Sequence, residues 1–413
     1  MAAKDFIKMM TQKRLWIVFF LGFSSGLPLL LTGGTLKTWL AREQVDISTI
    51  GYFSWVGMAY SLKFLWAPFV DRYKLLFWGR RRSWIFATQI GIAGSLFWLG
   101  SMQPQESLGL MAAIAVLIAF FSATQDIAID AYRREILEDE ELGMGSSLTQ
   151  YGYRIAMLIS GGVGIGLVGS DPFQLSWGGL YVLMALIVVT TLFITWKAPE
   201  PKDDEAHRPK TLATAVVEPF REFLTRDRAV LILAFVFLFK LGDALSAAML
   251  NPFYVEMGYS NQDIGFIAKF VGLISALSGL FIGGLIIFRL GVLRSLWVFG
   301  ILQGLSTAGF SIITFTGPEK WALALAVVFE DISAGMGSAA FIAYLSTLTD
   351  KRFTGTQFAL LSALATLGRN FFSGFTGDMV KTMGWAPFYW TCGLIAIPGL
   401  ILLWYLQKSQ RQV

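Results

Sequence analysis

The sequence predicts an all-α membrane protein, and its hydropathy and the positions of its basic residues are the main reasons. Hydrophobic residues make up 55% of the 413 positions, charged residues 15%, and the mean hydropathy is +0.60. A soluble protein has about 25% charged residues. Each apolar stretch is long enough to cross a hydrocarbon core of ~30 Å as a helix. The twelve stretches lie near residues 15–40, 47–69, 83–101, 108–131, 146–169, 177–196, 229–252, 262–288, 293–316, 321–346, 355–377 and 385–406.

The lysines and arginines predict how these stretches are oriented. If the N-terminus is cytoplasmic, 24 of the 33 basic residues lie on the cytoplasmic side, and six more lie inside the stretches. The opposite loops hold only Arg42, Lys320 and Lys381. This distribution follows the positive-inside rule, so we expect twelve transmembrane helices with both termini in the cytoplasm. The net charge of +5 comes from short loops on one face and does not indicate nucleic-acid binding.

The first stretch and the longest polar interruption define the expected domains. The basic N-terminus leads into a long span without a clean cleavage site, which indicates a retained helix and not a signal peptide. We expect a six-helix bundle over 1–196, a cytoplasmic central loop over 197–228 and a second six-helix bundle over 229–413. Within the loop, 212–224 is either an amphipathic helix on the membrane surface or a plain linker helix.

The two halves resemble each other weakly. A Leu-Gly pair at 21–22 recurs at 241–242, and an Ile-Gly pair at 50–51 recurs at 264–265. Each half also has a basic loop after its second span. Two pseudo-symmetric six-helix halves with this layout predict the major facilitator fold. The first of these loops is expected to be a gating loop, formed by Asp71, Arg72, Gly79, Arg80, Arg81 and Arg82.

Ionisable residues inside the apolar stretches are candidates for function, because buried charge is costly in a membrane and usually faces a cavity. The third, sixth, ninth and twelfth stretches have none in their interiors, and these are the outer helices of a facilitator. The remaining stretches contain Lys37, Lys63, Asp126, Asp130, Arg154, Lys240, Asp243, Lys269, Glu330, Asp331 and Arg369.

Four of these residues are acids expected to take part in proton coupling. Asp126 and Asp130 lie four residues apart and share a helix face, and Arg154 is expected at a similar depth. A buried carboxylate near a cation can exchange that partner for a proton. The alternative to direct transport function for Asp126 is a structural role. For Asp130 the favoured role is a latch that holds residues 80–82. Glu330 and Asp331 are the corresponding candidates in the second half.

The polar residues of the inner stretches are expected to bind an anionic substrate. The substrate-binding candidates are Gln125, Gln150, Tyr151, Arg154, Lys240, Asp243, Lys269 and Arg369. Two alternatives stay open. Lys240 and Asp243 could neutralise each other, and Lys269 and Arg369 could pair with the two acids of the tenth stretch. Four aromatic residues are candidates for stacking on sugars or for anchoring at the lipid interface: Trp39, Trp55, Tyr60 and Trp66.

Missing residues narrow the possible functions. The chain has one Cys, Cys392, and one His, His207, so one chain cannot form a disulfide, a His-based triad or a His/Cys metal cluster. No phosphate-binding G-x-x-x-x-G-K-[ST] motif occurs, which argues against an ATP-driven pump. We therefore expect no enzyme activity, no cofactor and no metal. A transporter without ATP takes its energy from a gradient, and buried carboxylates favour protons.

Five segments of this sequence together resemble the AmpG muropeptide permeases. They are LGFSSGLPLLLTGGTLKTWL (21–40), KFLWAPFVDRY (63–73), GRRRSW (79–84), ATQDIAIDAYRREIL (123–137) and QFALLSALATLGR (357–369). The similarity extends from about residue 12 to about residue 406. Some members continue beyond twelve spans at the C-terminus, whereas this sequence ends at Val413, so the resemblance leaves the substrate range open.

The resemblance implies a proton-linked facilitator of the Gram-negative inner membrane. Its members import N-acetylglucosaminyl-anhydromuramyl peptides from periplasm to cytoplasm during peptidoglycan recycling. The expected partners are therefore an anhydromuropeptide, protons and the lipid bilayer, with no nucleic acid, and the chain is expected to act as a monomer. One alternative is a facilitator for another bulky organic anion, such as a nucleotide-linked or peptide compound. A membrane enzyme or sensor of cell-wall lipids is a further alternative, for which no catalytic group or signalling domain is found.

Overall fold

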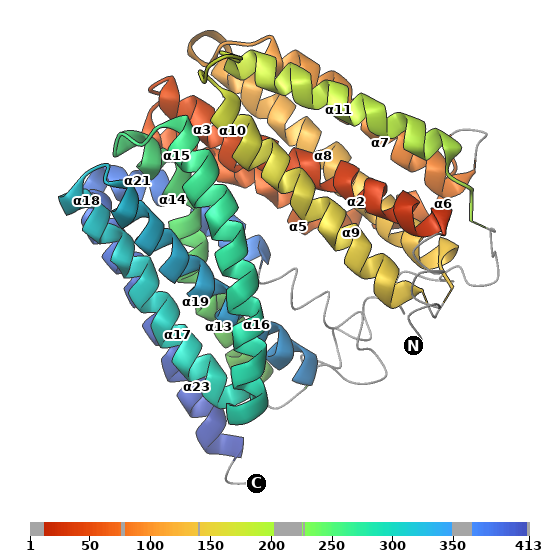
Figure 1. The fold of residues 1–413 in the computed structure, drawn as a ribbon. Helices are drawn as coiled ribbons and strands as arrows, with labels where there is room; N and C mark the ends of the chain where they lie inside the picture. The colour runs from red at the N-terminus through yellow and green to blue at the C-terminus, as the bar shows by residue number, and fades with distance from the viewer. Residues whose placement is uncertain are drawn as a thin grey trace. The chain divides into compact units, whose positions relative to one another are not determined.

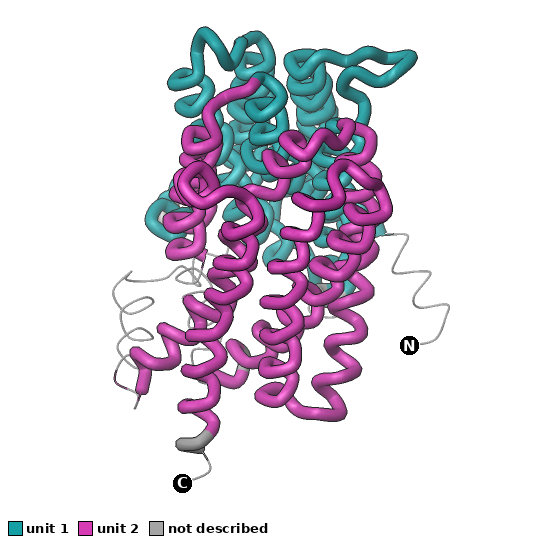
Figure 2. Tube along the Cα trace, turned by 90° about the vertical axis from the view of Figure 1, so that its left-hand side faces the viewer, with its two compact units in different colours: residues 1–43, 62–208 teal, residues 44–61, 209–413 magenta. Residues whose placement is uncertain are grey.

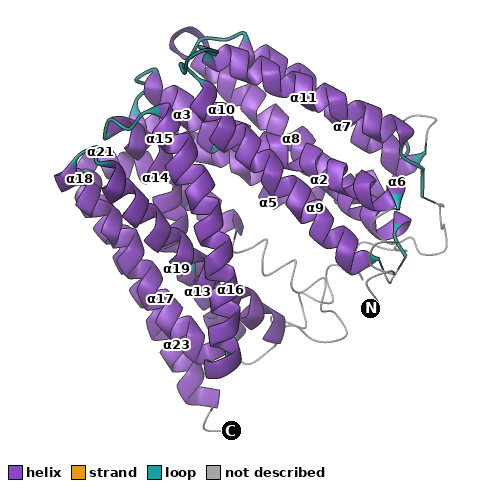
Figure 3. Ribbon diagram, viewed as in Figure 1, coloured by secondary structure: helices purple, strands orange, loops and turns teal. Residues whose placement is uncertain are grey.

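The structure is a computed structural model that describes residues 12–75, 79–138, 141–201, 225, 228–348 and 366–410. Every regular element in these ranges is helical, and no strand occurs among them (Figures 1 and 3). The described residues form two compact units, those that lie within 1–43 and 62–208 and those that lie within 44–61 and 209–413 (Figure 2). The predicted amphipathic helix at 212–224 lies outside the described residues.

Unit 1 contains most of the first six predicted spans. Its helices are α2 (Lys13–Thr32), α3 (Gly34–Arg42), η2 (Lys63–Leu65), α6 (Ala67–Arg72), α7 (Arg80–Gly100), α8 (Pro104–Ile136), α9 (Leu142–Met157), the π-helix η3 (Leu158–Val163), α10 (Gly164–Leu167) and α11 (Trp177–Lys197). Small residues allow α2 and α9 to lie backbone to backbone (Figure 1). A Cβ on Gly22 would overlap the main-chain oxygen of Thr149, and one on Gly26 would overlap Tyr153.

Unit 2 contains the remaining spans and the first part of the second. Its helices are α4 (Ile47–Tyr52), η1 (Phe53–Gly57), most of α5 (Met58–Leu62), α13 (Ala229–Phe239), α14 (Leu241–Glu256), α15 (Asn261–Asp263), the π-helix η6 (Ile264–Val271), α16 (Gly272–Leu290), α17 (Val292–Gly309), η7 (Phe310–Ile312), α18 (Ile313–Thr316), α19 (Lys320–Thr347), α21 (Thr376–Met383), α22 (Trp385–Leu394) and α23 (Ala396–Gln410). Helices α16 and α19 pack closely, because Gly279 and Gly283 of α16 have no side chains that would hold the backbones apart. A Cβ on either glycine would overlap the backbone of α19.

Residues 44–61 join unit 2 by polar contacts to α21. Lys381 Nζ lies 2.7 Å from Asp46 Oδ2, and the Tyr52 hydroxyl donates to Asp378 Oδ2 at 2.9 Å. Asp46 also caps the start of α4 by accepting main-chain N–H groups. The backbones approach closely here, since a Cβ on Gly51 would meet the main chain at residues 374 and 377. The N-terminal part of the predicted second span therefore belongs to the unit formed by the second half of the chain.

Eight of the described helical segments are long and apolar enough to cross a membrane. They correspond to predicted spans one, four, six, seven, eight, nine, ten and twelve. The second stretch is divided into short α and 3₁₀ segments, and the fifth contains the π-helix η3. The eleventh lies partly outside the described residues. The full count of twelve spans and the cytoplasmic termini stay predictions.

Candidate functional site

Asp126 of α8 is held between two other helical segments of unit 1. The Ser25 hydroxyl of α2 donates a hydrogen bond to Asp126 Oδ1, and Lys63 Nζ of η2 lies 3.7 Å from Asp126 Oδ2. The Asp126 side chain is only 15% exposed. The carboxylate therefore has one neutral donor and one cation, and it can lose the cation while it keeps the hydroxyl. The pairing of Asp126 with Lys63 and Ser25 could not be predicted from the sequence, because both partners come from distant positions.

Asp130 lies one turn further along α8 in a different environment. Its side chain is 58% exposed, and its carboxylate pairs with Arg133 of the same helix at 3.1 Å. The expected latch between Asp130 and residues 80–82 is therefore wrong. An acid and a base three residues apart on a helix are already neighbours, so the local pair forms without any tertiary contact.

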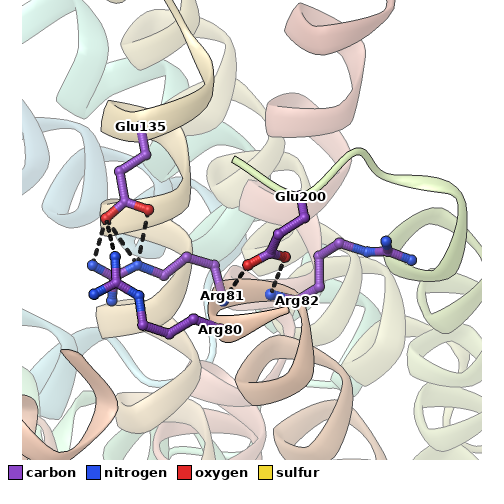
Figure 4. A network of polar contacts seen from close by, with 5 residues as sticks. All are labelled: Arg80, Arg81, Arg82, Glu135 and Glu200. Carbon is purple, nitrogen blue, oxygen red and sulfur yellow. Dashed lines mark hydrogen bonds and ion pairs between the residues drawn. The ribbon is translucent and has the colours of Figure 1, made fainter. Parts of the chain in front are cut away.

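Arg80 and Arg81 of the predicted gating loop pair instead with Glu135, near the end of α8 (Figure 4). Arg80 Nη2 lies 3.2 Å from Glu135 Oε1, while Arg81 bonds to the same carboxylate through Nε at 3.0 Å and Nη2 at 2.6 Å. The two arginine side chains are only 9% and 7% exposed. A forked guanidinium–carboxylate contact of this kind is among the stronger polar interactions in proteins. This pairing ties the start of α7 to the end of α8.

A second acid, Glu200, caps the start of α7. Its carboxylate accepts the main-chain N–H of Arg81 at 2.8 Å and that of Arg82 at 3.1 Å (Figure 4). A negative charge at a helix N-terminus satisfies free N–H groups and the helix dipole. Gly79 has φ of +109°, and a Cβ there would overlap Glu200, so glycine is needed at this position.

The remaining gating residues, Asp71 and Arg72, end α6, and their side chains lie outside the described residues. Their expected part in the gating loop stays a prediction. Neither Glu135 nor Glu200 was among the residues predicted from the sequence. The signal for Glu135 was its place in the charged run at the end of the fourth span, but nothing local indicated Glu200.

The polar residues near Asp126 separate into buried and accessible ones. Gln125 is fully buried, and its amide donates to the Ser24 hydroxyl at 2.8 Å, so it ties α8 to α2. Gln150 and Tyr151 are exposed on α9, and Arg154 is half-buried on the same helix. Arg154 follows Tyr153, whose backbone packs against Gly26 of α2. Gly26 is next in sequence to Ser25, which donates to Asp126. This contact places the α9 segment that carries Arg154 at the level of the acid.

In unit 2, Lys240 and Asp243 form an ion pair at 2.9 Å. The sequence left open whether these residues bind substrate or neutralise each other. In the structure they neutralise each other. Gln303 of α17 adds a hydrogen bond, from its Nε2 to Asp243 Oδ2 at 2.5 Å. The lysine side chain is buried, so the pair compensates charge in the interior of the unit.

The two acids of α19 have different surroundings. Glu330 is buried and accepts hydrogen bonds from Ser306 at 2.6 Å and from Thr307 at 3.2 Å. Asp331 lies directly against Gly272, where a Cβ would overlap its carboxylate.

The two remaining cations of unit 2 have neutral hydrogen-bond partners. Lys269 of η6 donates to Asn251 Oδ1 at 2.8 Å, and its charge interacts with that of Asp331. Arg369 donates to Thr366 at 3.0 Å, and its charge interacts with that of Asp243. The sequence left open whether Lys269 and Arg369 pair with the two acids of α19. The structure supports this for Lys269, whose charge interacts with that of Asp331.

Two of the aromatic candidates are committed to packing in unit 1. Trp39 is buried, with its ring stacked on Trp177 and tilted against Tyr181, so it neither contacts sugar nor anchors at the interface. Trp66 donates to the Thr124 hydroxyl at 2.9 Å. In the described residues no group of three or more His, Cys, Asp or Glu side chains is arranged to hold a metal ion.

The profile of the Major Facilitator Superfamily matches residues 18–373. Solved structures with the same fold include the nucleoside transporter NupG (TM-score 0.73, 14% identity, 96% of this chain and 98% of that one) and a D-xylose–proton symporter (TM-score 0.70, 14% identity, 94% and 96%). The chain is therefore a membrane transporter with the major facilitator fold, and not an enzyme.

Curated relatives narrow the class. The chain is 44% identical to the anhydromuropeptide permease of Escherichia coli K12 over 402 residues, 97% of this chain and 81% of that protein. It is 35% identical to a transporter of Rickettsia conorii that carries the name AmpG 4, over 97% of this chain and 98% of that protein. The chain belongs to the AmpG family of permeases. As a member with several helices of membrane-spanning length, it is a multi-pass protein of the bacterial inner membrane.

Proposed function

We propose that this chain imports anhydromuropeptides, that is N-acetylglucosaminyl-anhydromuramyl peptides, from periplasm to cytoplasm for peptidoglycan recycling, driven by the proton gradient. The relative from E. coli that shares 44% identity is named a permease for this class of compound. The observation that supports proton coupling is Asp126, a carboxylate enclosed in unit 1 with one cation and one hydroxyl as partners.

The proposed coupling uses the difference between these two partners. When Asp126 is ionised, Lys63 balances its charge, which a buried acid requires. When a proton binds Asp126, the ion pair is lost and Lys63 is released, while Ser25 stays within hydrogen-bond distance. A transporter needs such differential contacts, because a ligand shifts a conformational equilibrium only by binding one state better than the other. Glu330 and Asp331 are the candidate proton sites of unit 2.

The proposed substrate contacts are cationic, because the peptide part of an anhydromuropeptide carries carboxylates. Arg154 in unit 1 is the first candidate, since it is accessible and lies at the level of Asp126. Lys269 in unit 2 is the second, because its hydrogen-bond partner Asn251 is neutral and can be replaced by a carboxylate. Lys240 is already paired with Asp243, so it contributes to binding only if that ion pair opens.

Uptake of a labelled anhydromuropeptide into cells or vesicles tests the proposal. We expect accumulation that a protonophore abolishes, competition by peptide-bearing fragments, and weaker competition by the bare disaccharide. Asp126→Asn should abolish concentrative uptake and leave counterflow, because the amide cannot bind the proton. Asp171→Asn, which removes a carboxylate from an exposed loop, is the control and should leave uptake unchanged. Full protonophore-sensitive accumulation by Asp126→Asn would exclude Asp126 as the coupling acid. Competition by a nucleotide-linked or peptide anion instead would favour the alternative cargo.

A further inference from the structure

Helix α17 joins the acids of unit 2, although the ninth predicted span has no ionisable residue in its interior. Gln303, Ser306 and Thr307 lie on one face of α17, because residues three and four apart are neighbours on a helix. All three are almost fully buried. Gln303 donates to Asp243 of α14, and the two hydroxyls contact Glu330 of α19. One helix face therefore connects two carboxylates that belong to different helices.

The hydrogen bonds of Ser306 depend on the proton of Glu330. The Ser306 oxygen lies 2.6 Å from Glu330 Oε2 and 3.0 Å from the main-chain oxygen of Gln303. Both are acceptors when Glu330 is ionised, yet a serine hydroxyl has only one proton to donate. When a proton is bound to Glu330 Oε2, the acid donates to Ser306, and the serine proton turns to the Gln303 carbonyl. Both contacts are then satisfied at once.

The charges around Glu330 make this exchange relevant to the whole cluster. When Glu330 is ionised, it adds a second negative charge near Asp243. Lys240 is the cation that already pairs with Asp243. An unbalanced buried charge is costly, so the proton on Glu330 and the Lys240–Asp243 pair depend on each other. Among the described residues, the titratable and charged groups that act on Glu330, or on Asp243 beside it, include Lys240, Asp243, Tyr254, Asp331, Arg369, Tyr389 and Cys392.

We propose that Ser306 is a positioning residue that exchanges its hydrogen-bond partner with the proton on Glu330, assisted by Thr307, and that Gln303 links this exchange to the Lys240–Asp243 pair. The proposal rests on the proposed proton-coupled transport and assigns to unit 2 its own proton-responsive contact. Proton binding to Glu330 then changes how α17 is held to α19. Gly337 of α19 keeps the space for this link, because a Cβ there would overlap the Gln303 amide.

The test is a pH titration of the purified full-length protein in lipid vesicles, followed by infrared spectroscopy without substrate. The spectral region of the C=O stretch of protonated carboxyl groups should contain a band that is absent from the Glu330→Gln variant. Ser306→Ala removes a charge-assisted hydrogen bond from the anion but only neutral hydrogen bonds from the protonated acid, and the bond to the anion is about twice as strong as a neutral one. The pH at which half of this band is lost should therefore rise by about one unit or more, a roughly tenfold change in proton affinity. Ser306→Thr keeps a hydroxyl, so its titration should stay close to that of the wild type. Gln303→Leu should also move the titration, because it releases Asp243.

Ser295→Ala is the matched control. Ser295 is a buried serine of the same helix whose hydroxyl donates only to a main-chain oxygen, that of Gly291, among the described residues. Its titration should equal that of the wild type. The proposal is overturned if Ser306→Ala titrates like Ser295→Ala, or if Glu330→Gln removes no band. Because no substrate or gradient is present, a failure of muropeptide uptake or of proton coupling would leave this result intact. An unmoved titration with normal uptake would overturn this inference alone.

Discussion

Glu135→Gln is expected to destabilise unit 1 strongly, because it removes a carboxylate that pairs with both Arg80 and Arg81. Both guanidinium groups are almost fully buried, and Arg81 makes its contact through two nitrogens. Removal of one partner from a buried ion pair costs about 3–5 kcal/mol, since the other charge stays buried after it has lost that partner. The glutamine can still accept one hydrogen bond, so the lower end, about 3 kcal/mol, is the expected loss.

Glu138→Gln is the matched control for this change. Glu138 lies three residues further along the chain and pairs with Arg14 at 2.9 Å, but its side chain is 70% exposed, whereas that of Glu135 is 27% exposed. An exposed ion pair contributes about 0–1 kcal/mol. The two substitutions therefore remove the same group at nearly the same place, in different solvent environments.

The assay is equilibrium unfolding of the purified full-length protein in detergent, followed by tryptophan fluorescence. The difference between the two variants should be at least about 2 kcal/mol, and high salt should weaken only the Glu138 contribution. Equal losses would refute the reasoning, because burial of Arg80 and Arg81 would then not decide the value of the contact. Slower turnover of Glu135→Gln, with unchanged substrate affinity, would add support for a gating role of residues 80–82.

Three further changes have defined outcomes. Arg154→Ala should weaken competition by peptide-bearing muropeptides more than by the bare anhydro-disaccharide, because only the former has the extra carboxylates; equal weakening in the uptake assay would show that the cation serves packing. The Lys381 ammonium donates to Asp46 and holds the pKa of that carboxyl below its usual value of 3.8. The pair's contribution to stability is therefore present above about pH 4 and lost as the pH falls through the lowered pKa. Asp46→Asn should accordingly unfold more easily than the wild type near pH 7, and the two should converge once the pH has fallen through the lowered pKa; a difference that persists at low pH would rule out the ion pair as its cause. Gly22→Ala should destabilise by about 1–3 kcal/mol through overlap with the α9 backbone, whereas Gly94→Ala, with open space around it, should not, and thermal unfolding of both variants measures the difference.

Local composition was sufficient to predict the class of this protein. Apolar stretches of about twenty residues and basic residues on one side follow from the need to satisfy every backbone group inside lipid, which favours helices. The confinement of ionisable residues to eight of the twelve stretches indicated the facilitator fold, and the strings around Asp126 indicated the family. None of these inferences needs a tertiary contact, because hydropathy and motif are properties of neighbouring residues.

The pairing of charges could not be predicted in the same way. Asp130 was expected to hold residues 80–82, but it pairs with Arg133, whereas Arg81 pairs with Glu135 and Glu200 caps the helix that follows. Partners separated by more than fifty positions depend on how helices are rotated and how far each is shifted along its axis. Sequence spacing within one helix does not specify either quantity.

The neutral partners of the buried acids were also decided only by the fold. Ser25, Ser306 and Gln303 have no charge, so a search for ionisable residues in apolar stretches passes over them. They become important because the interior of a helix bundle leaves a buried carboxylate few donors, and a single hydroxyl there determines whether the acid is stabilised as an anion. The sequence alone thus determined which acids lie in the membrane, whereas the tertiary structure decided which groups stabilise their charges, because that depends on contacts between helices.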